Sequence, residues 1–330
     1  MVYGLILHIR HFLYDKGWKK SFSAAVPTVC VGNIAVGGTG KTPHTELILR
    51  KLLEAGRQPA VLSRGYKRKL KGFQVVPQDG TATLYGDEPV QIARKFPQVT
   101  VAVDKDRVRG CSQLSGANVI VLDDAFQYRR LQAMESIVLA DYNKPLSKDR
   151  LLPWGRLRDL PSRIRKASLV VVTKCPPFME DEDRRHWRKV LKLRKEQPLY
   201  FTTIRYCEPE PVFPEGDKHY LYAQQAVVVT GIADDTPLRK HLSDKYKLVG
   251  HLRFPDHHSY GRSSIRAIRN AAKAAPFACL FTTEKDARRL QCAKEVPQEL
   301  RQRLFYLPIE AAFLSAEEEA AFTGELLEKL

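Results

Sequence analysis

The residues with the clearest capacity for chemistry lie between positions 27 and 45, where the chain reads PTVCVGNIAVGGTGKTPHT. A glycine-rich run that ends in Lys41 and Thr42 is the pattern of a phosphate-binding loop, or P-loop. Its backbone N–H groups surround a triphosphate, its lysine reaches the outer phosphates and its hydroxyl can ligate Mg²⁺. Ala35 stands where the usual pattern has glycine. The residues expected to bind nucleotide are Gly37, Gly38, Thr39, Gly40, Lys41 and Thr42.

Acidic residues occur at two further places that suit phosphoryl transfer. Asp123 and Asp124 follow the apolar run at 118–122, and paired acids at the end of a strand beside a P-loop can hold Mg²⁺. Asp87 and Glu88 lie in a GDEP turn, where the proline can start a helix. Capping of a following helix is the alternative interpretation of both acidic pairs.

Two charged clusters lie in the last third of the chain. In the FPDHH segment His257 could transfer a proton near neutral pH, and an ordinary surface loop is the alternative. Adjacent histidines do not point the same way, so His257 and His258 do not favour a metal site. The TTEKD segment at 282–286 could form a network of internal salt bridges.

The elements that must position these residues follow an alternation of strands and helices. Val29, Val31 and Ile34 predict a buried strand before the glycines, and the apolar spacing at 47–53 predicts a helix after them. Further strands are expected near 59–63, 99–103, 118–124, 136–142 and 168–174, and helical segments at 88–95 and 176–200. This alternation of strands and helices predicts a P-loop NTPase-like α/β fold with a doubly wound, mostly parallel sheet.

A second, smaller α/β unit is expected in the last hundred residues. Strands are predicted at 226–234, 247–254 and 278–286, and a helix at 263–275. The expected divisions are residues 1–20 for an N-terminal helix, 21–205 for the P-loop core, 206–225 for a β-rich linker and 226–330 for the C-terminal α/β domain.

The N-terminal segment MVYGLILHIRHFLYDKGW is predicted to be an amphipathic helix. Its apolar residues, on roughly one helical face, are Leu5, Ile6, Ile9, Phe12 and Leu13. Such a helix suits a membrane interface, or it can pack on its own domain. Spanning a bilayer needs about 20 consecutive apolar residues, and this segment is too short and too charged for that.

Composition limits the partners. The 330 residues carry a formal charge of +17, which favours anionic partners, but no homeodomain, zinc-finger or RNP-type motif accompanies the basic runs. We therefore expect no nucleic-acid partner, and we expect a monomer. The six cysteines are irregularly spaced and no signal peptide precedes them, which indicates reduced thiols in the cytosol.

Seven motifs, VGNIAVGGTGKTP, SRGYKRK, GDEP, LDDAFQYRRL, LLPWGRLRD, FPDHHSY and FTTEKD, occur in this order and cover nearly the whole chain. Together they resemble the tetraacyldisaccharide 4'-kinase family of Gram-negative bacteria. That family transfers the γ-phosphate of ATP to the 4'-hydroxyl of an anionic glycolipid, tetraacyldisaccharide 1-phosphate, and forms lipid IVA in lipid A biosynthesis. The resemblance implies ATP and Mg²⁺ as cofactors. It also implies a peripheral or N-terminally anchored position at the cytoplasmic face of the bacterial inner membrane.

The resemblance also implies a role for individual residues. Asp87 is similar to the family's catalytic base, with His257 as its partner and Glu88 as support at the metal side. The other implied residues are Lys41 and Asp124 for catalysis, Thr42 and Asp123 for the metal, Gln127 for the nucleotide, and Arg64, Tyr66, Arg107, Tyr128 and Asp159 for the substrate.

Four features depart from the family's usual pattern. Ala125 follows the acidic pair where glycine is usual, and Tyr128 stands where the family has histidine. Asp159 replaces a glutamate, and many members carry a longer apolar N-terminal segment.

Without the resemblance, a soluble P-loop GTPase or ATPase of metallochaperone or ligase type stays open. A GTPase should show an N-K-x-D motif, and the nearest text here, TKCP at 173–176, lacks the aspartate. A basic nucleic-acid-binding module that uses ATP as a switch would need base-contacting motifs that the sequence lacks.

Overall fold

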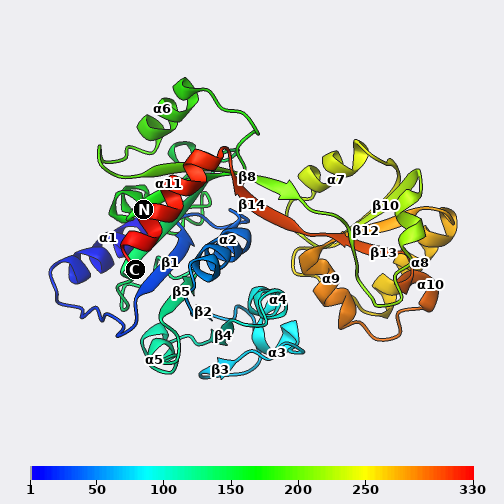
Figure 1. Ribbon diagram of the computed structural model, residues 1–330, viewed down its shortest axis with the longest axis horizontal. Helices are drawn as coiled ribbons and strands as arrows, with labels where there is room; N and C mark the ends of the chain where they lie inside the picture. The colour runs from blue at the N-terminus through cyan, green and yellow to red at the C-terminus, as the bar shows by residue number, and fades with distance from the viewer. Residues whose placement is uncertain (1) are drawn as a thin grey trace. The chain divides into compact units, whose positions relative to one another are not determined.

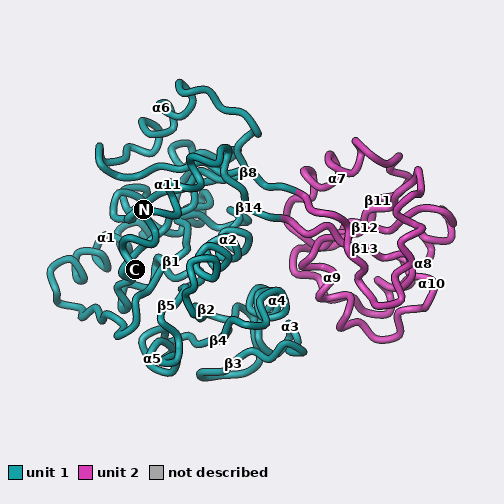
Figure 2. Tube along the Cα trace, in the orientation of Figure 1, with its two compact units in different colours: residues 1–205, 310–330 teal, residues 206–309 magenta. Residues whose placement is uncertain are grey.

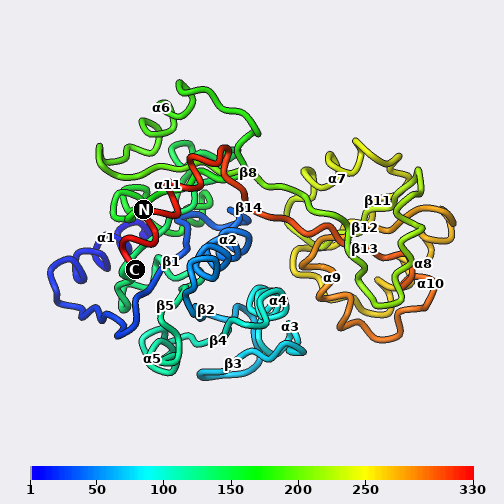
Figure 3. The backbone as a smooth tube through the Cα atoms, viewed as in Figure 1, coloured from blue at the N-terminus to red at the C-terminus, as the bar shows by residue number. Residues whose placement is uncertain are grey.

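The computed structural model describes residues 2–330, which form two compact units (Figures 1 and 2). The first unit runs to Arg205 and resumes at Glu310, and the second comprises Tyr206–Ile309. Figure 3 follows the chain out of the first unit after one strand and back along another. Each unit is built around its own sheet.

The sheet of the first unit has nine strands within the described residues, in the order β14-β8-β7-β6-β1-β5-β2-β4-β3. Their bounds are β1 (Thr28–Asn33), β2 (Pro59–Ser63), β3 (Gln74–Val75), β4 (Thr100–Val103), β5 (Val119–Asp123), β6 (Glu135–Asp141), β7 (Leu169–Thr173), β8 (Leu199–Tyr206) and β14 (Ile309–Phe313). β1 is parallel to both neighbours, β5 and β6, and β3 is antiparallel to β4. The doubly wound, mostly parallel sheet predicted from the sequence is confirmed.

Helices cover both faces of this sheet, so its central strands are buried throughout. The helices of the unit are α1 (Val2–Asp15), α2 (Lys41–Glu54), α3 (Ala82–Tyr85), α4 (Asp87–Lys95), α5 (Arg107–Ser112), α6 (Asp181–Val190) and α11 (Ala316–Glu328). Alternate residues of β1 point to opposite faces: Val29 and Val31 pack with α2, α4 and α11, whereas Cys30 packs toward α5. The strand order reverses at β1, which places the P-loop at the switch point of the sheet.

The second unit contains the order β11-β10-β12-β13-β9. Its elements are β9 (Glu210–Pro211), β10 (Gln225–Thr230), α7 (Thr236–Ser243), β11 (Lys247–Arg253), α8 (Arg262–Ala274), β12 (Cys279–Thr283), α9 (Glu284–Gln291), α10 (Gln298–Arg301) and β13 (Leu304–Leu307). Short 3-10 turns lie at 146–148, 161–166 and 218–222.

Two expected divisions of the chain are corrected. Residues 206–225, expected to be a linker, belong to the second unit, because β9 pairs with β13. Residues 310–330, expected to end the C-terminal domain, return to the first unit (Figure 1), because Phe322 and Leu326 of α11 are buried in its core. The helical prediction at 176–200 was too long, since α6 covers only Asp181–Val190.

A buried histidine ties the start of α2 to β8. His44 Nδ1 lies 2.7 Å from the carbonyl oxygen of Gly40, and Nε2 lies 2.8 Å from Thr202 Oγ1. Burial, together with the charge of Lys174, lowers the pKa of His44 to about 4, so the ring is neutral at pH 7. A carbonyl only accepts, so Nδ1 donates to Gly40 and Nε2 accepts from the hydroxyl of Thr202.

We therefore predict that Thr202→Val destabilises the protein by about 1–3 kcal/mol, because Nε2 of His44 loses its donor in a buried site. Denaturant unfolding measures the loss. Thr203→Val, at a more exposed position on the same strand, is the matched control and should change the free energy of unfolding by less than about 0.5 kcal/mol. Equal effects of the two substitutions would contradict the role given to His44.

Candidate functional site

The P-loop joins β1 to α2 in the predicted order of strand, loop and helix. Gly37 and Gly40 have φ values of 110° and 87°, in the region that favours glycine. Asn33 Nδ2 donates to Thr39 Oγ1 at 2.7 Å, and Thr173 Oγ1 donates to the carbonyl of Thr39 at 2.9 Å. The loop is thus fixed by residues at the ends of β1 and β7.

Ala35, the irregular position of the motif, is buried in the core beside Leu157. The backbone here is bound to the segment 156–158: Val36 N donates to the carbonyl of Arg156 at 2.7 Å, and Arg158 N donates to that of Ile34 at 2.9 Å. The methyl group of Ala35 therefore fills apolar space behind the loop.

The two acidic residues after β5 differ in their surroundings. Asp123 is buried and accepts a hydrogen bond from Ser63 Oγ at 3.1 Å. Burial, together with the charges of Asp124 and Glu88, raises the pKa of Asp123 to about 6. Burial would also raise the pKa of Asp124, but hydrogen bonds from Arg158 and the charge of Lys41 hold it below its ordinary value. No helix lies between β5 and β6 in the described chain, so this pair caps none.

Arg158 is a site residue that the sequence analysis did not single out. Its guanidinium makes short hydrogen bonds to the carboxylate of Asp124 and to Asn33 Oδ1. Lys41 Nζ lies 3.9 Å from Asp124 Oδ2 on the same carboxylate. Arg158 therefore joins the strand end before the P-loop to the acid that faces the P-loop lysine.

The GDEP turn packs against the loop that follows β2. A Cβ at Gly86 would lie 3.2 Å from the carbonyl oxygen of Tyr66 and 3.3 Å from Cα of Gly65, and this tight approach together with a φ of 102° favours glycine. Asp87 and Glu88 follow directly as the first residues of α4, while Gly86 holds the N-cap position. The contact places the two acids beside the basic loop, and the effect of Glu88 on Asp123 places it near the acidic pair.

Two of the expected substrate residues, Arg64 and Tyr128, lie close to a third, Arg107, at the start of α5. Its guanidinium lies 5.4 Å from the ring centroid of Tyr128, whose hydroxyl donates to Asp106 Oδ1 at 3.0 Å. Burial and the nearby charge of Arg64 hold the pKa of Arg107 below its ordinary value, although Asp123 acts in the opposite direction. Arg64 and Arg107 thus form a cationic group close to the acidic pair.

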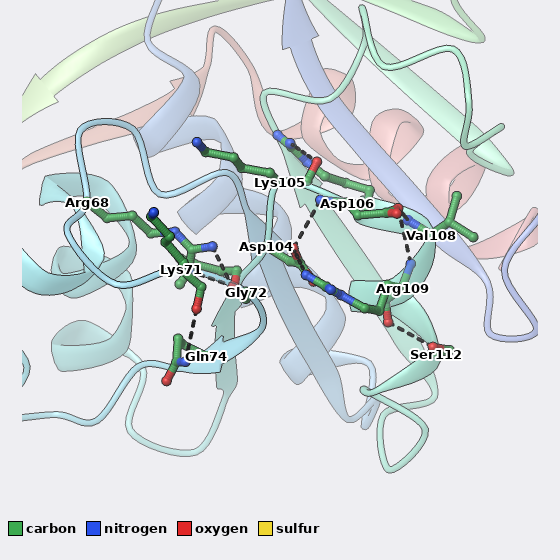
Figure 4. A network of polar contacts seen from close by, with 12 residues as sticks. Arg68, Lys71, Gly72, Gln74, Asp104, Lys105, Asp106, Val108, Arg109 and Ser112 are labelled. Atoms are coloured by element: carbon green, nitrogen blue, oxygen red, sulfur yellow. Dashed lines mark hydrogen bonds and ion pairs between the residues drawn. The ribbon is translucent and has the colours of Figure 1, made fainter.

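Figure 4 shows a polar network in the two neighbouring segments, the loop after β2 and the start of α5. Asp104 is fully buried and accepts two hydrogen bonds from Arg109, at 2.9 and 2.8 Å. Asp106 caps α5 by accepting from the backbone N–H groups of Val108 and Arg109. Arg68 donates to the last carbonyl of β4 at 2.9 Å. The network fixes both the loop after β2 and the first turn of α5.

Asp159, expected to bind substrate, is only 1% exposed. Its Oδ1 lies 2.6 Å from Nε2 of His11 on α1 and accepts from the backbone N–H of Leu160 at 2.8 Å. This corrects the expectation of direct substrate contact, because the carboxylate is enclosed by protein. Asp159 instead anchors α1 to the first unit.

α1 is also bound to the residues around the acidic pair. Tyr3 Oη donates to the carbonyl of Arg158 at 2.8 Å, and Arg10 donates to the carbonyl of Gln127 at 2.7 Å. The side-chain amide of Gln127 donates in turn to the carbonyl of Asn33 at 2.5 Å. Gln127, expected to bind nucleotide, thus braces the strand end beside the P-loop.

His257 lies in the second unit, in the loop after β11, with a φ of 61°. Arg289 Nη2 lies 3.1 Å from its Nδ1, and Asp256 Oδ2 lies 4.0 Å from its Nε2. The neighbouring His258 instead stacks on Phe254 and lies 2.7 Å from the hydroxyl of Ser264. The two histidines have different partners, as the sequence analysis expected.

The donor set beside the P-loop fits Mg²⁺. This ion keeps several waters and uses one or two carboxylates together with phosphate oxygens. Thr42 and Asp123 are both buried at this edge and offer a hydroxyl and a carboxylate oxygen, with Glu88 near by. Among the residues that the structure describes, no three His, Cys, Asp or Glu side chains form a complete metal cluster of their own.

Comparisons with known proteins agree with this geometry. The family model described as tetraacyldisaccharide-1-P 4'-kinase matches residues 1–330. The chain is 40% identical to the tetraacyldisaccharide 4'-kinase of Phocaeicola vulgatus, covering 96% of this chain and 90% of that one. It is 38% identical to that of Porphyromonas gingivalis, covering 99% and 94%.

A solved structure is similar over nearly the whole length. The crystal structure of LpxK from Aquifex aeolicus in complex with ATP has a TM-score of 0.75 and 27% identity, covering 98% of this chain and 95% of that one. The resemblance carried by the seven motifs is therefore confirmed, and the chain belongs to the tetraacyldisaccharide-1-P 4'-kinase family.

Proposed function

We propose that this protein is a lipid kinase that transfers the γ-phosphate of ATP to the 4'-hydroxyl of tetraacyldisaccharide 1-phosphate and forms lipid IVA in lipid A biosynthesis. The observation that carries the proposal is the P-loop lysine, Lys41, 3.9 Å from the strand-end acid Asp124, in a chain that the family model matches from end to end. A P-loop and an acid at this position are the parts that phosphoryl transfer requires.

At the phosphate end, positioning and charge supply most of the catalysis. Lys41 neutralises the outer phosphates, and Arg158 holds Asp124 as a carboxylate beside it. Thr42 and Asp123 would hold Mg²⁺, which supplies charge neutralisation on the transferring phosphoryl oxygens.

At the acceptor end, Asp87 is proposed as the general base. A sugar hydroxyl is too weak an acid to ionise at neutral pH, so a carboxylate must accept its proton as the new P–O bond forms. By the family resemblance His257 acts together with this carboxylate. Asp87 stands at the first turn of α4, where the helix dipole favours its ionised form.

The cationic group of Arg64 and Arg107 suits an anionic acceptor. Tyr66 is 58% exposed on the same loop as Arg64, and its ring can cover the apolar face of a sugar. Tyr128 replaces the histidine usual in the family, and its hydroxyl is bound to Asp106. We propose that these residues hold the disaccharide.

The N-terminal helix is proposed to bind the membrane surface at the cytoplasmic face of the bacterial inner membrane. Leu7 and His11 of α1 are buried, whereas Leu5, Ile6 and Ile9 are each more than half exposed. Phe12 and Trp18, 49% and 73% exposed, extend this apolar surface. No helix within residues 2–330 combines the length and apolar character that a membrane crossing requires. An apolar helix face beside basic residues is typical of interfacial attachment.

The central experiment incubates the purified protein with ATP, Mg²⁺ and tetraacyldisaccharide 1-phosphate and detects one added phosphate by mass spectrometry. Lys41→Ala should lower ATP affinity and turnover, since the outer phosphates lose their cation. Unchanged ATP affinity and turnover would contradict the P-loop assignment.

We predict that Asp87→Asn lowers kcat by at least about 100-fold, because an amide cannot accept the proton of the hydroxyl. The KM for ATP should change less than about twofold, because Asp87 lies outside the P-loop. Asp79→Asn, which removes an exposed acid upstream on the same chain segment, is the control and should leave both parameters unchanged. Near-normal turnover of Asp87→Asn would remove it as the base.

Arg158→Met should raise the Kd for ATP by about tenfold or more, because Asp124 then loses the cation that holds it in place. Titration with ATP and Mg²⁺ in the absence of lipid measures the effect. Arg156→Met, which removes a neighbouring arginine paired with Asp149, serves as the control. If both variants bind ATP equally, Arg158 has no part in the nucleotide site.

For membrane attachment, the double variant Leu5→Gln with Ile9→Gln should bind anionic vesicles about tenfold more weakly, because two apolar side chains no longer enter the interface. Vesicle co-sedimentation of the full chain measures the binding. The control pair, Tyr222→Gln with Phe277→Gln, removes two exposed aromatic residues from the second unit. If both double variants lost vesicle binding equally, or if neither lost any, the proposal that α1 binds the membrane surface would be contradicted.

A further inference from the structure

The charged TTEKD segment at 282–286 has no role in the proposed function. Its residues form a network of hydrogen bonds that lies next to His257. Thr283 caps α9, and its hydroxyl donates to Asp286 Oδ2 at 2.7 Å. The backbone N–H of Gly231 donates to the same oxygen at 2.9 Å. Asp286 is fully buried. The internal network expected for this segment is therefore present, and one end of it reaches the histidine.

Arg289 connects this carboxylate to His257. Its Nη1 lies 3.0 Å from Asp286 Oδ1 and 3.0 Å from the carbonyl oxygen of Gly231. Its Nη2 lies 3.1 Å from Nδ1 of His257. The backbone N–H of His257 also donates to the carbonyl of Gly231, at 3.1 Å. The ring of His257 is thus bound to Arg289, and its backbone N–H is bound to the same carbonyl of Gly231 that Arg289 contacts.

Gly231 allows this arrangement because it has no side chain. A Cβ at this position would lie 2.9 Å from Asp286 Oδ1 and 3.2 Å from Cβ of His258. The backbone of Gly231 can therefore contact both the first turn of α9 and the loop that carries His257, at the point where β10 ends. Side chains this enclosed have few alternative rotamers, which fixes the guanidinium against the ring.

The chemistry of the contact determines where the proton of His257 lies. A guanidinium has only N–H donors and no acceptor, so Nδ1 must accept and cannot itself carry a proton while the bond exists. The proton of the ring is then on Nε2. In this tautomer His257 offers one N–H donor through Nε2 and has no acceptor left.

We infer that Arg289, held by Asp286, is a positioning residue that fixes His257 in the Nε2–H tautomer, so that His257 serves the reaction as a hydrogen-bond donor and not as a proton acceptor. This inference rests on the proposed function in so far as it concerns catalysis. The two residues then have different roles at the acceptor. Asp87 takes the proton of the sugar hydroxyl, and His257 donates a hydrogen bond that orients an anionic oxygen.

The tautomer can be measured directly in the full-length protein. Long-range ¹H–¹⁵N correlation spectra of the ¹⁵N-histidine-labelled chain distinguish a protonated from an unprotonated ring nitrogen, and comparison with His257→Gln identifies the signals of His257 among the nine histidines. We expect a protonated Nε2 and an unprotonated Nδ1 in a single tautomer. A protonated Nδ1, or exchange between both tautomers, would overturn the inference, whether or not the protein proves to be the proposed kinase.

Variants test the part played by Arg289. Arg289→Met removes the donor, so the signals of His257 should show both tautomers, and kcat should fall roughly tenfold while the KM for ATP changes less than about twofold. Arg289→Lys keeps a donor and should recover part of kcat together with the single tautomer. Arg288→Met is the matched control on the same helix, because Arg288 pairs with Glu284 and contacts Tyr306.

Several outcomes separate the two ideas. A wild-type spectrum and wild-type kcat in Arg289→Met would overturn the inference and leave the kinase assignment intact. Absence of lipid phosphorylation by the wild-type protein would overturn the proposed function and leave the spectrum to decide the tautomer. If Arg289→Met does not fold, Asp286→Asn replaces it: a carboxamide holds the guanidinium less tightly, and a ring spectrum identical to wild type would again contradict the inference.

Discussion

The contact on which the first unit's site depends is the pairing of Arg158 with Asp124. It lies where β1 and β5 end side by side, the point at which the strand order reverses. Two acids and a lysine crowd this edge, and burial alone would favour protonation of the acids. The guanidinium keeps Asp124 ionised and also binds Asn33, whose amide holds Thr39 of the P-loop. One side chain therefore contributes both to the geometry of the P-loop and to the charge of its acid.

The same arginine connects the nucleotide edge to α1. The carbonyl of Arg158 accepts from Tyr3, and the next residue, Asp159, is paired with His11. A helix that offers its apolar face outward is thus held to the unit by polar contacts on its inner side. Tyr3 and Arg10 bind backbone carbonyls of residues that contact the ends of β1 and β5. A displacement of α1 would therefore be transmitted to these strand ends. The proposed membrane helix is thus bound directly to the segments that carry Gln127 and Arg158.

The sequence predicted the elements better than the contacts between them. The strand at NVIVLDD could be predicted because a strand that is buried on both faces is apolar along most of its length. The two acids that follow the apolar run then mark its carboxyl end. The return of α11 was missed, because Phe322 and Leu326 indicate only that a helix face is buried and not which core receives it. Arg158 and His11 were missed for the same reason: their partners lie 34 and 148 positions away along the chain. Asp159 was misassigned since a carboxylate in a motif has no local sign that tells a buried anchor from a ligand contact.

Three histidines illustrate why residue type alone does not determine chemical role. His44 faces a carbonyl with Nδ1, so that nitrogen must carry the proton. His11 and His257 each face an arginine with Nδ1, at 3.2 and 3.1 Å, so in both the proton must lie on Nε2. In His11 that proton is directed at the buried carboxylate of Asp159, which makes an anchor, whereas Nε2 of His257 lies 4.0 Å from the partly exposed carboxylate of Asp256. An arginine that donates to Nδ1 thus leaves Nε2 as the donor of the imidazole in both cases. In His11 this donor serves the fold, and in His257 we propose that it serves the reaction.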